Sequence, residues 1–128
     1  STPLDLHITS LIIRNGAANF DSNGIKKLSS NIVLNRLTDD SLNVTIKRTS
    51  FIDNSGMVVK ELNGNIWANF TNSNFNIPYW HLKLPSSEIN LDRIHVSKNT
   101  DNKYDFDGSI YFPQLSMDDF TPVCHHTA

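Results

Sequence analysis

Apolar and polar residues alternate along most of this chain with the period of a β-strand. Between residues 25 and 35, even-numbered positions from Leu28 to Leu34 carry most of the apolar side chains, and odd-numbered positions are mostly polar. Successive side chains of a strand point to opposite sides, so this pattern predicts a strand with one apolar and one polar face. A helix needs apolar residues three and four positions apart, which this segment does not sustain.

The pattern occurs twice. Residues 25–35 read IKKLSSNIVLN and residues 59–69 read VKELNGNIWAN, so Lys, Leu, Asn, Ile and Asn recur at equivalent places. A polar turn and a second apolar run follow each copy. A duplicated unit of this kind predicts a repeat architecture, in which each unit buries its apolar face against its neighbours.

Turn residues divide the alternating segments into about eight strands. Asn15-Gly16 predicts a tight hairpin with a short return strand through Ala18 and Phe20, and Asp107-Gly108 predicts another hairpin. Pro78 lacks a backbone donor, so its strand is expected to be at an edge or distorted. The expected fold is an all-β antiparallel meander with little or no helix, shaped as a curved β-trough or an incompletely closed sandwich.

The predicted organisation is one β segment over residues 1–122, taken from a longer repeat protein, with a disordered tail at 123–128. Net charge is -2, so the chain lacks the net positive charge that is typical of nucleic-acid-binding domains. The single cysteine, Cys124, allows no internal disulfide. No apolar run approaches the roughly 20 residues of a membrane-spanning helix.

Candidate catalytic and metal-binding residues do not form a known motif. Asp101, Asp105 and Asp107 faintly resemble a calcium loop, but Lys103 and Gln114 stand where ligands are needed. The other candidates lack a partner nucleophile or a converging ligand set, and we therefore predict no enzyme, no metal site and no cofactor. They are His7, His81, His95, the pairs Asp39-Asp40 and Asp118-Asp119, and the tail residues Cys124, His125 and His126.

Two tryptophans support an alternative. Trp67 occupies the otherwise polar face of its predicted strand, and Trp80 lies near Tyr79. Exposed aromatic rings can stack on sugars, so a carbohydrate-binding β-sandwich using Trp67 and Trp80 is one competing hypothesis. Packing of Trp67 under a loop or a neighbouring strand is the simpler interpretation, because Trp is seldom left exposed. A structural module that binds nothing small is a second alternative.

Much of the chain resembles the TamB and AsmA-like envelope proteins, particularly the long ones of Bacteroidota. The resemblance rests on a strand with an aliphatic pair, on paired strands, on a serine-glycine unit, on a proline corner and on a closing segment. These are residues 6–21, 25–37 with 42–46, 55–62, 82–91 and 111–122. The histidine-rich tail and the Tyr79-Trp80 pair depart from the family pattern.

The resemblance implies a periplasmic, non-catalytic part of a cell-envelope protein. Such a segment would serve phospholipid transport between membranes or outer-membrane protein assembly. Its expected partners are phospholipid acyl chains, adjacent β segments of the same parent chain and outer-membrane assembly partners. The predicted groove lining consists of the apolar residues of the two repeat copies and the strand between them: Leu28, Ile32, Leu34, Leu42, Val44, Ile46, Leu62, Ile66, Ala68 and Phe70.

Overall fold

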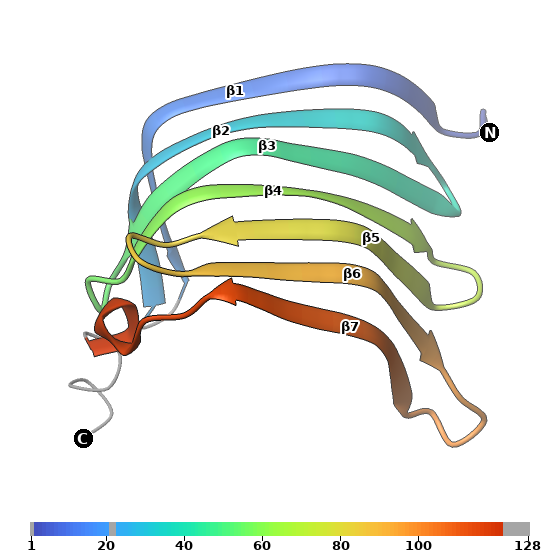
Figure 1. The fold of residues 1–128 in the computed structure, drawn as a ribbon. Coiled ribbons are helices and arrows are strands. Elements are labelled where there is room, and N and C mark those ends of the chain that lie inside the picture. Colours follow the sequence, from blue (N-terminus) through green and yellow to red (C-terminus); the bar gives the residue numbers. More distant parts are fainter. Residues whose placement is uncertain (1, 21–22, 122–128) are drawn as a thin grey trace.

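The computed structural model describes residues 2–20 and 23–121, and they form one antiparallel sheet of seven strands (Figure 1). A short 3-10 helix, η1, spans Met117–Phe120 after the last strand. The strands are β1 (Asp5–Phe20), β2 (Asn23–Thr38), β3 (Ser41–Asp53), β4 (Val58–Asn69), β5 (Asn74–Lys83), β6 (Glu88–Lys98) and β7 (Tyr104–Gln114).

The strands are ordered in space as they are in sequence, from β1 to β7, and every neighbouring pair is antiparallel. The expected all-β antiparallel meander is therefore confirmed. The sheet is not closed, so β1 and β7 each leave one edge without a strand partner within the described part of the chain. Figure 1 shows the strands bent near both ends of the sheet, which makes it curved.

The strand register sorts side chains into an apolar face and a polar face. Directly paired residues point to the same side of a sheet. One row of partners that crosses all seven strands is apolar apart from a glycine: Leu11, Ile32, Ile46, Gly64, Trp80, Leu91 and Ile110. A second row on the same face is wholly apolar: Leu6, Leu37, Leu42, Ala68, Phe75, Val96 and Phe106.

The opposite, polar face carries amides, imidazoles and hydroxyls. One of its rows consists of His7, Arg36, Asn43, Trp67, Asn76, His95 and Asp107. The two repeat copies form β2 and β4, on either side of β3. Their Asn35 and Asn65 amides both donate to Asn43 Oδ1 and Thr45 Oγ1 of β3, at 2.7 to 3.2 Å. These hydrogen bonds join the three central strands on the polar face.

Two predicted hairpins lie inside continuous strands, one at a bulge and the other opposite a bulge of the neighbouring strand. Asn15 has a φ of 52° but lies within β1, where the register with β2 shifts between Ile13 and Gly16. Gly108 lies within β7, where its backbone is so close to Ile94 that a Cβ would meet Ile94 Cα at 2.8 Å. Both hairpin predictions were wrong, and the sheet has seven strands: Asn15 takes its positive φ at a bulge of β1, and Gly108 leaves room for the bulge of β6 between Asp92 and His95.

The expectation for Pro78, that its strand is at an edge or distorted, is confirmed by the distortion. The register between β4 and β5 shifts between Asn65 and Trp67, which places a bulge beside Pro78. The strand is distorted as expected, but β5 lies inside the sheet, between β4 and β6. A bulge leaves a residue outside the hydrogen-bond ladder, and this is where a proline is tolerated.

Few residues are buried, because the described residues form a single layer. The buried apolar residues are Val59, Ala68 and Leu84. Side chains such as Ile66 of the apolar face and Asn65 of the polar face are both half-buried, so the faces differ in composition more than in exposure. None of the described helical segments is long and apolar enough to cross a membrane.

Helix η1 packs against one end of the sheet, at the corner between β5 and β6. The backbone N–H of Ser86 donates to both carboxylate oxygens of Asp119, at 3.1 and 3.0 Å. The Ser87 hydroxyl donates to the Ser116 carbonyl and accepts from the Ser116 N–H at 2.9 Å. The predicted corner after Pro85 is confirmed, since the Leu84 N–H donates to the Ser87 carbonyl.

Candidate functional site

The predicted groove residues lie together on the apolar face. Nine of the ten belong to β2, β3 and β4, and their register gives them one orientation. Phe70 is the exception, because it lies in the turn after β4, where its N–H donates to the Asp40 carbonyl at 2.7 Å. The nine strand residues therefore share one face of the sheet, whereas Phe70 lies beyond the end of β4.

The apolar face extends further than the sequence indicated. The two edge strands contribute Leu11 from β1 and Phe106 and Ile110 from β7. These side chains are 55%, 76% and 57% exposed, which makes the sheet edges the most accessible apolar parts of this face. Their alternation was visible in the sequence, but only the register joined them to the central strands.

The two tryptophans lie on opposite faces of the sheet. Trp80 is paired with Gly64 on the apolar face, whereas Trp67 is paired with Asn43 and Asn76 on the polar face. No second sheet is present among the described strands, so they form neither a sandwich nor a platform of two tryptophans. Trp67 remains 51% exposed, so it does not pack under a loop or a neighbouring strand.

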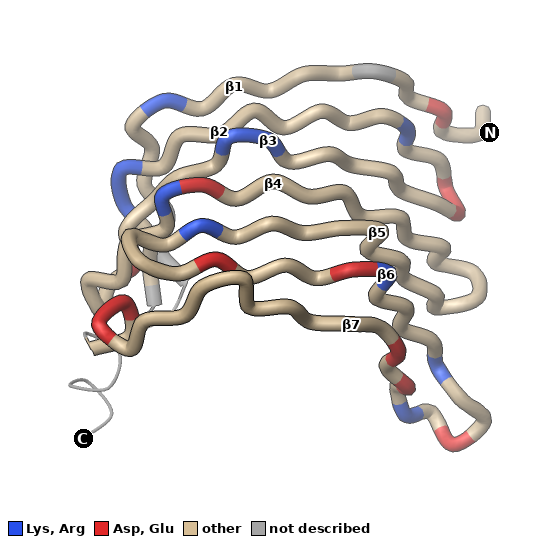
Figure 2. The backbone as a smooth tube through the Cα atoms, viewed as in Figure 1, with Lys and Arg blue, Asp and Glu red and all other residues tan. Residues whose placement is uncertain are grey.

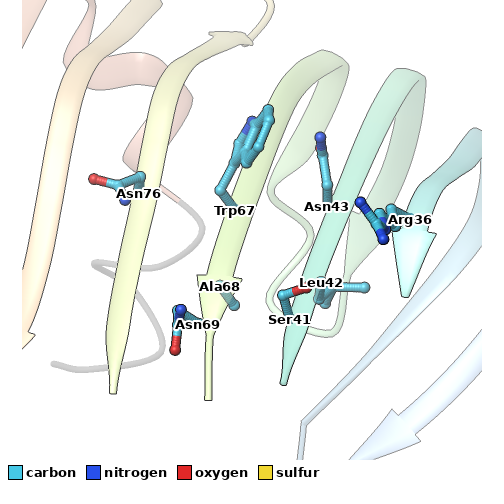
Figure 3. A pocket seen from close by; sticks show the side chains of 8 residues that line it. All are labelled: Arg36, Ser41, Leu42, Asn43, Trp67, Ala68, Asn69 and Asn76. Atoms are coloured by element: carbon cyan, nitrogen blue, oxygen red, sulfur yellow. The ribbon is translucent and has the colours of Figure 1, made fainter. Parts of the chain in front are cut away.

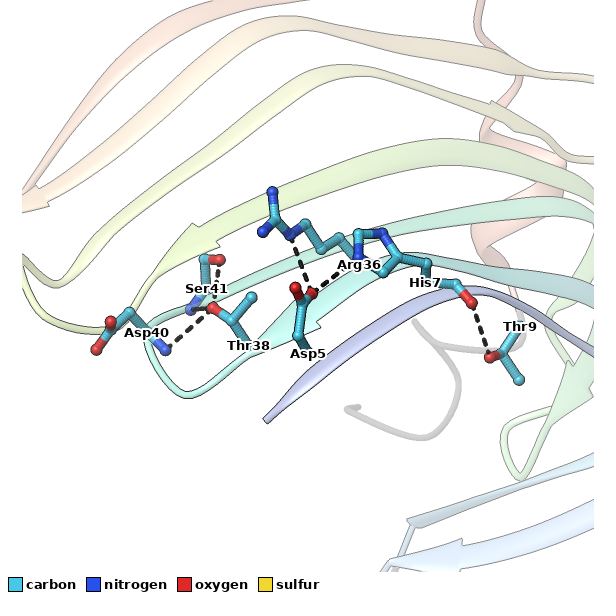
Figure 4. Close-up of polar contacts among 7 residues, drawn as sticks. All are labelled: Asp5, His7, Thr9, Arg36, Thr38, Asp40 and Ser41. Carbon is cyan, nitrogen blue, oxygen red and sulfur yellow. Dashed lines mark hydrogen bonds and ion pairs between the residues drawn. The ribbon is translucent and has the colours of Figure 1, made fainter. Parts of the chain in front are cut away.

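A hollow of about 340 Å³ lies beside Trp67 on the polar face. Its lining includes Arg36 of β2, Asn43 of β3 and Asn76 of β5, and Figure 3 shows these side chains around the indole. Arg36 Nε lies 3.4 Å from Asp5 Oδ1, which is also 3.0 Å from His7 Nε2 (Figure 4). This hollow combines an aromatic ring, three asparagine amides (Asn43, Asn69 and Asn76) and one ion-paired guanidinium.

A second hollow on the polar face, of about 350 Å³, is lined by Tyr79, His81, Asn90 and Tyr111 among others. The His81 Nδ1–H donates to Asn90 Oδ1 at 2.5 Å, and the His95 Nδ1–H donates to Asn76 Oδ1 at 2.6 Å. Both imidazoles therefore have amide partners. The sheet separates the candidate histidines along different strands of its polar face.

The candidate acidic residues have local structural roles. Leu4 N–H donates to Asp39 at 3.2 Å, and Thr71 donates to Asp40 at 3.1 Å. In the calcium-like segment, the Asn99 side chain accepts from the backbone of Asp101 and Lys103, which makes this a hydrogen-bonded turn. Over residues 2–20 and 23–121, no group of three or more His, Cys, Asp or Glu residues could hold a metal ion. Cys124, His125 and His126 lie outside the described residues.

The Asp53 carboxylate organises the turn between β3 and β4. It accepts from the Ser55 N–H at 2.9 Å, the Ser55 hydroxyl at 2.5 Å and the Met57 N–H at 2.9 Å. Burial alone would raise the pKa of Asp53, but these hydrogen bonds to its charged form outweigh burial and hold the pKa below its ordinary value. Residues 53–56 therefore form the turn that joins β3 to β4.

Comparison of the chain with protein-family models, with curated protein sequences and with solved structures found no match.

Proposed function

We propose that this chain is a non-catalytic β segment of a TamB/AsmA-like cell-envelope protein, whose apolar face holds phospholipid acyl chains. The observation that carries the proposal is the uncovered apolar face, which crosses all seven strands in one wholly apolar row and one row that is apolar apart from Gly64. Domains normally bury such a face against a second layer. In this chain three of its edge residues, Leu11, Phe106 and Ile110, are more than half exposed.

Acyl chains suit this face because its side chains are mostly apolar, with a few hydroxyls such as Thr9, paired with Leu34, and Thr49, paired with Leu62. Each methylene that leaves water gains about 0.8 kcal/mol, so a few methylenes in contact with the face outweigh the cost of ordering a chain. Contiguous exposed apolar surface of this kind marks an interaction site in soluble proteins. Such a site would accept many different lipids, as transport of bulk phospholipid between membranes requires.

The two free edges support the proposal of neighbouring β segments. β1 is 16 residues long, and its outer backbone groups have no strand partner among the described residues. A long unpaired edge pairs readily with another strand, and proteins usually block such edges. Addition of further segments at β1 and β7 would lengthen the apolar face into a continuous periplasmic trough, in which outer-membrane assembly partners could also join.

Site-specific photocrosslinking in cells tests the acyl-chain proposal. A benzophenone amino acid at Ile66 should crosslink to phospholipid, whereas the same group at Asn65 should not, because these β4 neighbours point to opposite faces. The Ile66 and Asn65 side chains are both half-buried, so the two variants are matched in solvent exposure. Lipid adducts that are equal at both positions, or absent at Ile66, would contradict the proposal.

A carbohydrate-binding role remains a second candidate because of Trp67. The exposed indole, with Asn43 and Asn76 as its paired neighbours, provides a stacking surface flanked by amides that can hydrogen-bond to hydroxyls. Glycan-array binding that is lost on Trp67→Ala and kept on Tyr104→Ala would favour it. Tyr104 is similarly exposed but lies on the apolar side, paired with Lys98 of β6. Absence of glycan binding would remove this candidate.

A further inference from the structure

Basic side chains form a band across one end of the sheet. Seven of the eleven Lys and Arg residues lie there, on five successive strands, and all seven are exposed. Figure 2 shows them in the bent region of these strands. The basic band consists of Arg14, Lys26, Lys27, Lys47, Arg48, Lys60 and Lys83. Neighbouring strands are about 4.8 Å apart, so these charges are close to one another.

Bulges bring basic residues into this band. The register shifts on each of the first four strands, and the residues left without a partner across the shift include Arg14, Lys27, Arg48 and Lys60. Lys27 has a φ of 54° and Arg48 a φ of 50°, in the left-handed region. Gly or Asn normally takes such a position, because a larger side chain strains the backbone there. Residues held in this conformation occur often at binding and active sites, so their position in the band suggests a ligand site.

The charges of the band are not neutralised by ion pairs. In the described part of the chain, the ion pairs are His7–Asp5, Arg36–Asp5 and Arg93–Asp92, all outside the band. The nearest acidic residues along the register are Glu61 and Glu88, which flank Lys83. Arg14, Lys27 and Arg48 lie away from these two carboxylates, toward the β1 side of the band.

A hollow lies within the band on the polar face. Arg14 of β1 and Arg48 of β3 line it together with Ser29 and Asn31 of β2 and Asn15 of β1. The backbone around Arg48 is held by a hydrogen bond from its N–H to Asn63 Oδ1 at 2.8 Å. The hollow measures about 660 Å³, within the usual range of about 300–1,000 Å³ for ligand sites.

We propose that this hollow binds a phosphate group. Two guanidinium groups from strands on either side of β2 suit bidentate contacts to phosphate oxygens, and the Ser29 hydroxyl and the Asn15 and Asn31 amides supply further donors. The remaining lysines of the band attract the anion over a longer range. The phosphate could belong to a lipid headgroup at a membrane surface or to a soluble ligand, and both present the same chemistry to the hollow.

This site is distinct from the proposed acyl-chain surface. The proposed phosphate contacts lie on the polar face, where Asn31 is paired with Ile12. Ile13 and Ser30, which also line the hollow, are paired on the apolar face but supply none of these contacts. A failure of the acyl-chain proposal therefore leaves the phosphate site untouched, and each can be tested separately.

The test compares two double variants with equal charge change. Arg14→Gln with Arg48→Gln alters the hollow, and Lys98→Gln with Lys103→Gln alters exposed positions of β6 and the β6–β7 loop. Binding is measured by sedimentation with phosphatidylcholine vesicles that contain or lack phosphatidylglycerol, and by NMR titration with inorganic phosphate. Circular dichroism establishes that both variants keep their strand content.

The expected result is that at least one phosphate probe binds the native chain: phosphatidylglycerol vesicles, inorganic phosphate or both. The arginine double variant should bind that probe about 30-fold more weakly, since each basic residue near an anionic surface contributes a factor of about 5. The lysine variant should change binding less than 3-fold. Binding of vesicles alone identifies a membrane headgroup, and binding of inorganic phosphate alone identifies a soluble ligand. Equal loss in both variants, or no binding of either probe, would overturn the proposal.

Discussion

Trp80 lies across the backbone of Gly64, its partner on the neighbouring strand. A Cβ built on Gly64 would overlap the indole ring, so only glycine leaves room for Trp80 at this position of the row. The indole Nε1 is enclosed and has no hydrogen-bond partner. An aromatic ring over a strand glycine covers backbone that would otherwise be exposed, which is a known way to stabilise a glycine in a sheet.

The Gly64→Ala variant should therefore be less stable, by about 1–3 kcal/mol in the free energy of unfolding, because the added methyl displaces the indole. Urea unfolding followed by circular dichroism measures this. In a Trp80→Ala background the same Gly64→Ala change should be nearly neutral or stabilising, since the overlap is gone. Equal losses in both backgrounds would show that Trp80 is not the cause.

Replacing the strained lysine of β2 should stabilise the chain. Lys27 has a φ of 54°, so Lys27→Gly relieves left-handed strain and should raise the free energy of unfolding by about 0.5–1 kcal/mol. Lys26 is also exposed but does not have a positive φ. Lys26→Gly should therefore lower the free energy of unfolding by a similar amount. Thermal unfolding of the two variants should shift in opposite directions, and a shared direction would contradict the strain at Lys27.

Of the two acidic residues in η1, only Asp119 should be needed to hold the helix against the sheet. Asp119 is 8% exposed and accepts both hydrogen bonds from the Ser86 N–H, whereas Asp118 is exposed. Asp119→Ala should cost about 1–3 kcal/mol and release η1 from the β5–β6 corner, because the Ser86 N–H loses its hydrogen bonds to a buried carboxylate. Faster amide hydrogen exchange at Ser86 would report the release. Asp118→Ala is the control and should leave that exchange rate unchanged.

Acid should weaken the turn between β3 and β4. The folded-state pKa of Asp53 lies below its ordinary value of 3.8, so the unfolded chain binds the proton more readily. The contribution of this carboxylate to stability is complete above the unfolded pKa and is lost as the pH falls through the folded pKa. Asp53→Asn should flatten the dependence of stability on pH below about pH 4. A slope unchanged from that of the native chain would show that Asp53 does not contribute.

The turn signals illustrate where sequence reasoning fails for this chain. Asn15-Gly16 and Asp107-Gly108 have the composition of two-residue hairpins, yet both lie inside long strands. Asn15 takes a positive φ at a bulge, which a hairpin turn would also need, and Gly108 is required because the backbone of β6 approaches it closely. Only the pairing with a neighbouring strand distinguishes these positions from hairpin turns, and that pairing is not local in the sequence.

Alternation alone determined that this chain is an antiparallel all-β meander, and it placed Ile32, Val44 and Ile66 on a common face, because the side-chain period of a strand is a local property. The tertiary structure decided what parity could not. It set Trp67 and Trp80 on opposite faces, since a bulge at Pro78 changes the phase between them. It also gathered Arg14, Lys27 and Arg48 into one band, since register joins residues that lie far apart in the chain.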